Sequence, residues 1–339
     1  MTSINREVRM ESNRTIRVAV VGSGTMGQVY ASCLKKIANA DFAGFHSRPT
    51  EAANAAAERF GTRLYGSYEE LLANPDIDAV CITLPTYLHR EYAIQALENG
   101  KHVICEKPIA LNVPDAEAMI SASERYGRKL LVGHILRFMP EYRNVYNHVR
   151  KGSIGNVGVC HAKRASLHPP AGSWFHDGTL SGGVLFDLMI HDIDFMLWTV
   201  GSVRSVYAKV HKAPGIEYAN ATLRFDNGAI ANLEAHWGYP GPFRAEVELA
   251  GPAGILRSSN ANANPMTRLD SAQKQGAGEG VYIPQSMLRK DPYLSELEHF
   301  ISCIRTGAEP IVTASDATDA VRIALAAGES ARTGLPQRL

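Results

Sequence analysis

The sequence predicts a two-domain α/β protein, with an N-terminal doubly wound parallel sheet and a C-terminal α+β domain whose open sheet is mainly antiparallel. Three observations predict this class. Short apolar segments alternate with helical patterns up to about residue 134, which is typical of βαβ units. Alternating apolar and polar segments follow, and two of them flank the hairpin signal Asp226-Asn227-Gly228. At 339 residues, the chain is long enough for two domains.

The first domain is expected to span residues 15–134, after a polar leader of residues 1–14. Pro114 at a helix start and Gly100 after a helix end are typical boundary residues. The expected strands are Ile16–Val21, Phe42–Phe45, Ala79–Thr83, His102–Cys105 and Lys129–Gly133. The expected helices are Gly27–Ile37, Thr50–Phe60, Tyr68–Leu72, Tyr87–Asn99 and Pro114–Tyr126.

The second domain is expected to span residues 135–339, with its last helix available to pack back on the first domain. Residues 260–280 are polar and rich in Gly, Ala and Asn, which predicts a mobile loop. The expected helices are Pro140–Arg150, Gly183–Val200, Tyr293–Arg305 and Ser315–Thr333. The expected strands are Val157–Ser166, Val203–His211, Tyr218–Phe225, Ile230–Trp237, Ala245–Ala250 and Gly254–Arg257.

Composition argues against nucleic-acid and membrane partners. The formal net charge is +1 and no block of Lys or Arg is present. The most apolar stretch, Val184–Val200, contains three aspartates and a histidine, which excludes a simple membrane span. The five cysteines are scattered without close pairs, which predicts reduced thiols and a cytoplasmic location.

A glycine-rich turn, Gly22-Ser23-Gly24-Thr25-Met26-Gly27, follows the first expected strand directly and opens a helix. In such a turn the first glycine permits the tight bend, the second lets a pyrophosphate approach the backbone, and the third lets helix and strand pack closely. The helix N-terminus then faces the phosphates. This arrangement predicts a Rossmann domain that binds NAD or NADP, and the alternative is a purely structural turn.

The end of the second expected strand bears on the choice of cofactor. A carboxylate about twenty residues after the glycine turn usually binds the ribose 2′-hydroxyl of NAD. Here the strand ends in Phe45-His46-Ser47-Arg48, which has no carboxylate, and Ser47 and Arg48 are suited to a 2′-phosphate. This favours NADP over NAD, unless Arg48 is simply solvated.

The tripeptide Glu106-Lys107-Pro108 ends the fourth expected strand, since Pro108 cannot continue the hydrogen-bond ladder. Open α/β sheets bind their ligands at such carboxyl ends. An ammonium group beside Glu106 can donate to a substrate oxygen or shuttle a proton. The alternative is a surface ion pair before a turn.

The apolar helix around residue 190 carries a second set of polar side chains. At about 3.6 residues per turn, Asp187, His191 and Asp194 fall on one face, whereas Asp192 points away. A carboxylate one turn from a histidine fixes its tautomer and suits a general base. A structural Asp–His pair in the core is the alternative. No third ligand is evident nearby, so no metal is predicted.

Together these elements resemble the glucose–fructose oxidoreductase, inositol dehydrogenase and rhizopine catabolism family (Gfo/Idh/MocA). The resemblance extends from Ile16 to about Leu335. Further segments that carry it are Asp78-Ala79-Val80, Leu84-Pro85-Thr86-Tyr87-Leu88-His89, Ala96-Leu97-Glu98-Asn99-Gly100-Lys101-His102-Val103, Val132-Gly133-His134 and Arg137-Phe138-Met139-Pro140-Glu141-Tyr142-Arg143.

The resemblance implies roles for individual residues. Lys107, Asp187 and His191 match the family's catalytic residues, and the Lys107–Pro108 bond is expected to be cis. The implied nicotinamide-side contacts are Thr83, Leu84, Pro85, His89, Glu106 and Lys107. The implied substrate residues are Lys107, Arg137, His168, Trp174, Asp187 and His191, with Phe175 in the same loop. Ser47 replaces the acidic ribose ligand of the NAD-dependent members, and the loop of residues 168–177 matches no known specificity.

The expected activity is hydride transfer between a nicotinamide and a secondary alcohol or ketone of a sugar, inositol or related polyol. Two alternatives stay open: a glycosidase that retains its NAD and cleaves through a transient ketone, and a cofactor-binding regulator without catalysis. A homodimer or homotetramer built through the second sheet is also expected, because its helices can cover only one face.

Overall fold

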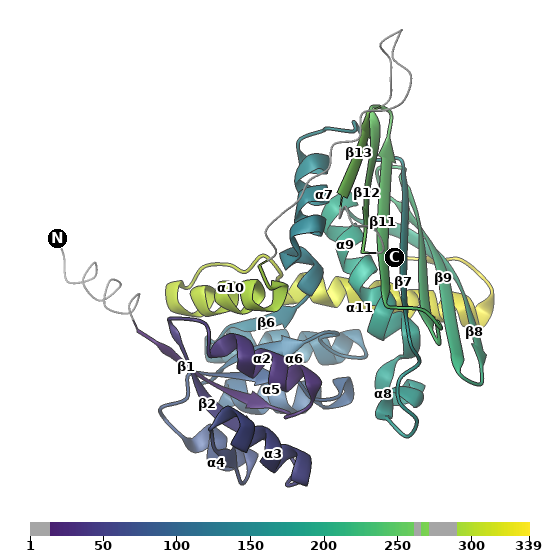
Figure 1. Cartoon of the computed structure of the whole chain (residues 1–339). Helices are drawn as coiled ribbons and strands as arrows, with labels where there is room; N and C mark the ends of the chain where they lie inside the picture. The colour runs from purple at the N-terminus through teal and green to yellow at the C-terminus, as the bar shows by residue number, and fades with distance from the viewer. Residues whose placement is uncertain (1–13, 261–265, 271–289) are drawn as a thin grey trace, which may run out of the picture. The chain divides into compact units, whose positions relative to one another are not determined.

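Figure 1 shows the computed structural model of the chain, which describes residues 14–260, 266–270 and 290–339. The chain divides into two units. Unit 1 contains the chain up to Ile135 together with Lys290–Thr318, and unit 2 contains Leu136–Arg289 and Asp319–Leu339. The predicted leader lies outside the described residues except for Arg14, which pairs with Asp78.

Unit 1 is built on a six-stranded, fully parallel sheet of order β3-β2-β1-β4-β5-β6. The order reverses between β1 and β4, so right-handed crossovers place the helices of the two halves on opposite faces. The strands are β1 Ile16–Val21, β2 Ala40–His46, β3 Leu64–Tyr65, β4 Ala79–Ile82, β5 His102–Glu106 and β6 Leu130–Gly133. The helices are α2 Thr25–Leu34, α3 Glu51–Phe60, α4 Tyr68–Ala73, α5 His89–Glu98 and α6 Val113–Tyr126, with a 3₁₀ turn η1 at Thr86–Leu88.

The predicted parallel sheet is therefore confirmed, with one addition. The short strand β3 was not expected, because two residues carry no periodic pattern. Side-chain caps begin α3, α4 and α6, where Thr50, Ser67 and Asn112 each accept a hydrogen bond from a backbone N–H three residues on. These caps fix where the connections after β2, β3 and β5 turn into their helices.

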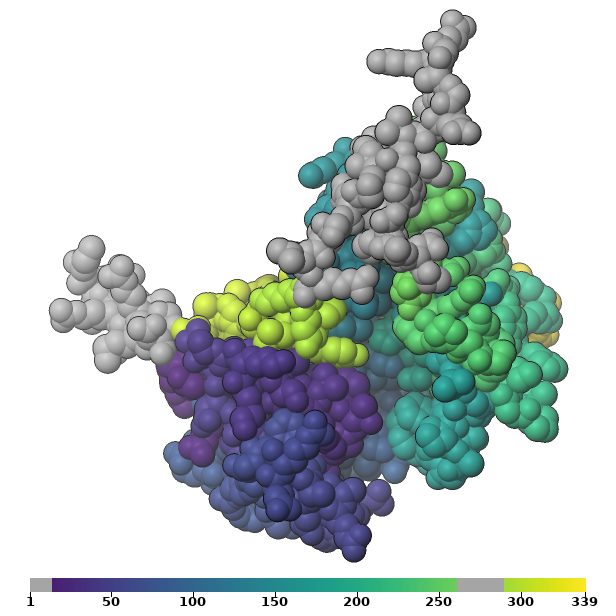
Figure 2. All heavy atoms as spheres, viewed as in Figure 1, coloured from purple at the N-terminus to yellow at the C-terminus, as the bar shows by residue number. Residues whose placement is uncertain are grey.

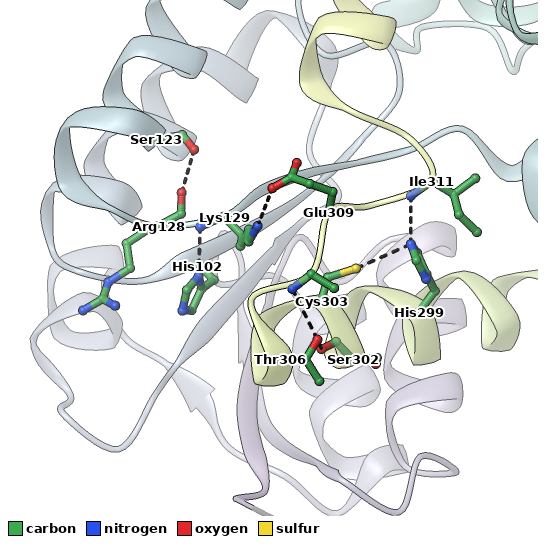
Figure 3. A network of polar contacts seen from close by, with 11 residues as sticks. His102, Ser123, Arg128, Lys129, His299, Ser302, Cys303, Thr306, Glu309 and Ile311 are labelled. Atoms are coloured by element: carbon green, nitrogen blue, oxygen red, sulfur yellow. Dashed lines mark hydrogen bonds and ion pairs between the residues drawn. The ribbon is translucent and has the colours of Figure 1, made fainter. Parts of the chain in front are cut away.

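A segment from the far end of the sequence completes unit 1. Helix α10, Pro292–Thr306, packs on α2, and Figure 2 shows the two in contact, α10 in yellow-green and α2 in purple. Figure 3 shows how the chain after α10 is held: the Ile311 N–H donates to His299 Nε2 (2.9 Å), and Lys129 Nζ pairs with Glu309 (3.1 Å). The sequence analysis placed residues 290–318 in the second domain, whereas their contacts are with unit 1.

Unit 2 contains an eight-stranded sheet of order β13-β12-β11-β7-β10-β9-β8-β14, in which every pairing is antiparallel except β7 with β10. The mainly antiparallel prediction is confirmed, and Gly228 supplies a positive φ of 91° in the predicted hairpin. The strands are β7 Val159–Ser166, β8 Val203–Ala213, β9 Ile216–Phe225, β10 Ile230–Trp237, β11 Arg244–Gly251, β12 Gly254–Ser259, β13 Met266–Asp270 and β14 Gln337–Arg338. The helices are α7 Pro140–Arg150, α8 Gly178–Ser181 and α9 Ile190–Val200, and α11 Ala314–Thr333 begins in unit 1 and continues in unit 2.

Three predictions in unit 2 need correction. Residues 266–270 form strand β13 rather than part of a loop; the rest of the predicted loop after Asn260 lies outside the described residues. Strand β14 was not expected. The predicted helix Gly183–Val200 is interrupted by a π-helical turn, η4 Leu185–Met189, which precedes α9. Across the described residues, no helix has the length and apolar character needed to cross a membrane.

Candidate active site

The three glycines of the turn after β1 differ in what surrounds them. Gly22 has a φ of 103°, and a Cβ on it would lie 2.8 Å from the Thr83 carbonyl oxygen. A Cβ on Gly27 would lie 1.9 Å from the Gly22 oxygen, whereas one on Gly24 meets no heavy atom within 4 Å. Gly22 and Gly27 are therefore required by the fold itself. Gly24 instead leaves an exposed surface at the N-terminus of α2, beside Thr25 and Met26. This surface fits a pyrophosphate group.

The residues that follow β2 turn in different directions. His46 Nδ1 lies 3.3 Å from the Tyr65 carbonyl oxygen, and the ring stacks on Tyr68 at 5.6 Å between centroids. His46 thus contributes to packing. Ser47 is partly exposed and Arg48 is exposed, in keeping with the residues predicted to meet the ribose.

The loop after β4 is tied to both of its neighbours. The Thr83 hydroxyl donates to the Val21 and Gly22 carbonyl oxygens (3.0 and 3.1 Å), which holds the glycine turn in place. His89 is 1% exposed, and its ring nitrogens lie 2.9 Å from the carbonyl oxygens of Leu84 and Pro108. The His89 ring, which the sequence analysis assigned to the cofactor, is thus enclosed and bridges the loops after β4 and β5. Leu84 and Pro85 are partly exposed beside it.

The loop after β5 presents Lys107. The Lys107–Pro108 peptide is cis, as predicted, and the Lys107 N–H donates to Glu106 Oε2 (3.2 Å). Lys107 is partly exposed, whereas Glu106 is 8% exposed and interacts with the buried Tyr30. Glu106, which the sequence analysis assigned to the cofactor, thus directs one carboxyl oxygen to the backbone of its own loop.

In unit 2, Asp187 lies in the π-helical turn and His191 in the first turn of α9, both partly exposed. A π-turn follows an i→i+5 hydrogen-bond pattern, so the 3.6-residue argument for one shared face fails across Asp187. Trp237 Nε1 donates to Asp187 Oδ2 (3.3 Å). Glu217 accepts the Val184 N–H (3.0 Å) and so anchors the start of this helix.

The other two aspartates of this helix are buried in ion pairs. Arg137 donates to Asp194 through Nε (3.1 Å) and Nη2 (2.6 Å), and Arg164 donates to Asp192 through Nε (3.0 Å) and Nη2 (2.8 Å). All four side chains are at least 95% buried. The sequence analysis grouped Asp194 with Asp187 and His191, and gave Arg137 as a substrate residue; in the structure Arg137 and Asp194 form this buried pair.

An aromatic group lies beside Asp187. The ring of Trp237 contacts His168 and Phe175, each with 5.9 Å between centroids, and Trp174 stacks on Phe175 at 4.0 Å. The predicted residues His168 and Trp174 are thus linked to Asp187 through Trp237. The sequence analysis missed Trp237 and Glu217, although both lie at strand ends that pair in register.

Within the described ranges, no group of three or more His, Cys, Asp and Glu side chains is placed to hold a metal ion. Each unit thus carries its own group of candidate residues: the loops after β1, β2, β4 and β5 in unit 1, and Asp187, His191 and the aromatic group in unit 2.

Comparison with known proteins identifies the family. Residues 16–134 match the oxidoreductase family profile described as an NAD-binding Rossmann fold, and residues 147–339 match its C-terminal alpha/beta domain. The chain belongs to the Gfo/Idh/MocA oxidoreductase family. The resemblance seen in the sequence is confirmed, as is the assignment to NAD(P)-binding oxidoreductases.

Relatives cover nearly the whole chain. The scyllo-inositol 2-dehydrogenase (NAD(+)) of Bacillus subtilis is 30% identical, and the match covers 96% of each chain. The myo-inositol 2-dehydrogenase of Thermotoga maritima is 27% identical, with 93% of this chain and 96% of the relative covered. The solved structure of levoglucosan dehydrogenase with NADH and L-sorbose has a TM-score of 0.88 at 22% identity, covering 96% of this chain and 99% of the other, and so supports the fold.

Proposed function

We propose that the protein is a dehydrogenase or reductase that moves a hydride between a nicotinamide and a secondary alcohol or ketone of a sugar, inositol or related polyol. The observation that carries the proposal is the glycine turn, since it is open only at Gly24, where a dinucleotide requires access. The names of the inositol dehydrogenases among the relatives support the substrate class.

In this proposal, Lys107, Asp187 and His191 each have a separate role in proton transfer and charge stabilisation. The bound nicotinamide exchanges the hydride. In the oxidation direction, His191 takes the hydroxyl proton and Lys107 donates a hydrogen bond to the same oxygen, which stabilises the developing negative charge. Asp187, oriented by the indole N–H of Trp237, fixes the tautomer of His191, which lies four residues further along the chain in α9.

A screen of sugars and polyols with both cofactors, followed by nicotinamide absorbance, tests this function. Lys107→Ala and His191→Ala should each lower kcat by roughly a hundredfold on the substrate found. Near-normal kcat in either variant would contradict the assigned roles. Cleavage of a glycoside without net turnover of the cofactor would instead support the retaining glycosidase, and binding without any turnover would support a regulator.

We also propose that NADP is preferred over NAD. His46 is occupied by Tyr65 and Tyr68, which leaves Ser47 and the exposed Arg48 to meet a 2′-phosphate. Arg48→Ala should weaken NADP binding and leave NAD binding nearly unchanged, whereas Ser47→Asp should favour NAD. Equal losses for both cofactors in Arg48→Ala would argue against the preference.

The same protein is proposed to form a homodimer or homotetramer in the cytoplasm. Exposed apolar side chains lie on the open face of the unit 2 sheet, where Val159 (45% exposed) and Ile230 (40% exposed) are register partners. The five cysteines are buried and unpaired, which fits a reducing compartment. Light scattering that returned the mass of one chain at micromolar concentration would contradict the oligomer.

A further inference from the structure

A buried acidic cluster lies beneath the Lys107 loop in unit 1. It consists of Glu296 from α10, Tyr30 from α2 and Glu106 at the end of β5. Tyr30 and Glu296 are fully buried, and Glu106 is 8% exposed. Buried acids are rare unless they are paired, and no role has been assigned to Glu296 so far.

Tyr30 links the two carboxyl groups. Its hydroxyl oxygen lies 3.3 Å from Glu296 Oε2 and is also hydrogen-bonded to Glu106. The neighbouring β6 residue is Gly133, where a Cβ would lie 2.8 Å from the Tyr30 hydroxyl and 3.4 Å from Glu296 Oε2. The cluster is thus closed by close packing against Gly133 and leaves no room there for a side chain.

The electrostatics of this enclosure disfavour two ionised carboxylates. Burial raises the pKa of Glu296 well above its usual range, and the nearby Glu106 raises it further, while the hydrogen bond from Tyr30 opposes them. The thiols of Cys33 and Cys81 face the same region and add no positive charge. In addition, Glu296 Oε1 is buried and has no hydrogen-bond partner within the part of the chain that the structure describes, which is costly for a carboxylate and much less so for a neutral acid.

We propose that Glu296 is held protonated and that the chain Glu296–Tyr30–Glu106 leaves a single negative charge, on Glu106. An ionised Glu296 would accept the Tyr30 proton across the 3.3 Å contact, whereas a protonated Glu296 donates to the Tyr30 oxygen and leaves the Tyr30 proton for Glu106. Glu106 in turn accepts the backbone N–H of Lys107 through Oε2. Glu296 is therefore a positioning residue, which acts on Lys107 through Tyr30 and Glu106. The protonation is independent of the proposed function, whereas the effect on Lys107 rests on it.

Infrared difference spectroscopy tests the proton directly. At neutral pH, subtracting the spectrum of Glu296→Gln from that of the full-length protein should reveal the carbonyl stretch of a protonated carboxylic acid, shifted in D₂O. Glu298→Gln, on the same helix and in an ion pair with Lys290, is the control and should lose no such band. A difference spectrum that shows only carboxylate bands in Glu296→Gln would overturn the proposal.

Kinetics test the positioning role separately. Glu296→Leu removes the donor to Tyr30 and so changes the hydrogen bonding of Glu106. A change of about one unit in the pKa of Glu106 corresponds to a tenfold change in its protonation equilibrium, so kcat should fall roughly tenfold. Glu296→Gln keeps a donor and should recover much of that loss, with cofactor affinity unchanged in both variants. Equal kcat and identical pH profiles for the Leu and Gln variants would overturn this role. If no polyol were turned over at all, the proposed function would fail while the infrared result would stand.

Discussion

Substitution of Gly24 and Gly27 by alanine should separate cofactor binding from folding. Gly24 has φ −70° and ψ −166°, a conformation that alanine adopts, and its Cβ would meet nothing within 4 Å. Gly24→Ala should therefore leave the free energy of unfolding unchanged or raise it by about 0.4–1 kcal/mol, because the unfolded chain loses freedom. At Gly27 a Cβ would lie 1.9 Å from a backbone oxygen, so Gly27→Ala should cost about 3 kcal/mol or more.

Gly24→Ala, which should not destabilise the fold, should instead weaken binding of the cofactor. A methyl group on Gly24 keeps the pyrophosphate from the backbone and costs at least one charge-assisted hydrogen bond, about 1.5–3 kcal/mol. That free energy corresponds to a loss of affinity of roughly ten- to a hundredfold. Urea unfolding without cofactor and fluorescence titration with NADPH and NADH measure the two quantities.

Gly158→Ala is the matched control, since a Cβ there also meets nothing within 4 Å and the residue precedes β7 in unit 2. It should affect neither quantity by more than about 1 kcal/mol. A Gly24→Ala protein that binds both nucleotides as tightly as the wild type would refute the assignment of this turn to the pyrophosphate, as would one that unfolds as readily as Gly27→Ala.

Three further outcomes follow from buried groups. Arg137→Met should lower the free energy of unfolding by about 3–5 kcal/mol, because Asp194 is left unpaired, and the double variant with Asp194→Leu should recover much of it in urea unfolding. The folded-state pKa of Glu296 is raised, so wild-type stability should fall as pH rises above the unfolded value near 4.5, by up to about 1.4 kcal/mol per pH unit. Glu296→Gln lacks this loss, so its melting temperature should gain on that of the wild type as the pH rises above about 5. A difference that stays constant with pH would contradict the raised pKa. Trp237→Phe should lower kcat about tenfold by removing the donor to Asp187, whereas Trp198→Phe, which disturbs a ring stacked on Tyr146, should change stability but not kcat.

Local pattern was sufficient for much of unit 1. Strands β1, β4 and β6 are almost entirely buried and read as short apolar runs, and each glycine or capping residue acts within a few positions of the element it bounds. The turn of residues 22–27 in unit 1 and the hairpin at Asn227-Gly228 in unit 2 were both predicted from such local patterns. The assignment of α10 was not accessible in the same way, because the contact of Tyr30 with Glu296 joins residues 266 positions apart.

The site was less predictable because its charges depend on partners distant in sequence. Glu106 and His89 look like surface residues at strand and helix ends, yet both are enclosed by groups from other loops. The aspartates of the helix around residue 190 illustrate the same limit. Asp192 and Asp194 each meet an arginine in the core, whereas Asp187 is partly exposed and accepts the neutral N–H of Trp237.

The π-helical turn explains why the helical periodicity misassigned these aspartates. It inserts a wider turn at Leu185–Met189, so the angular relation between Asp187 and the residues of α9 departs from that of a regular helix. Asp194 then faces Arg137 rather than sharing a face with Asp187. Loss of the Asp194 carboxylate from this pair would leave the buried Arg137 guanidinium without it, at a cost of several kcal/mol. The two buried ion pairs and the position of Asp187 are thus coupled through one turn, and any substitution that restored regular helix there should disturb all three.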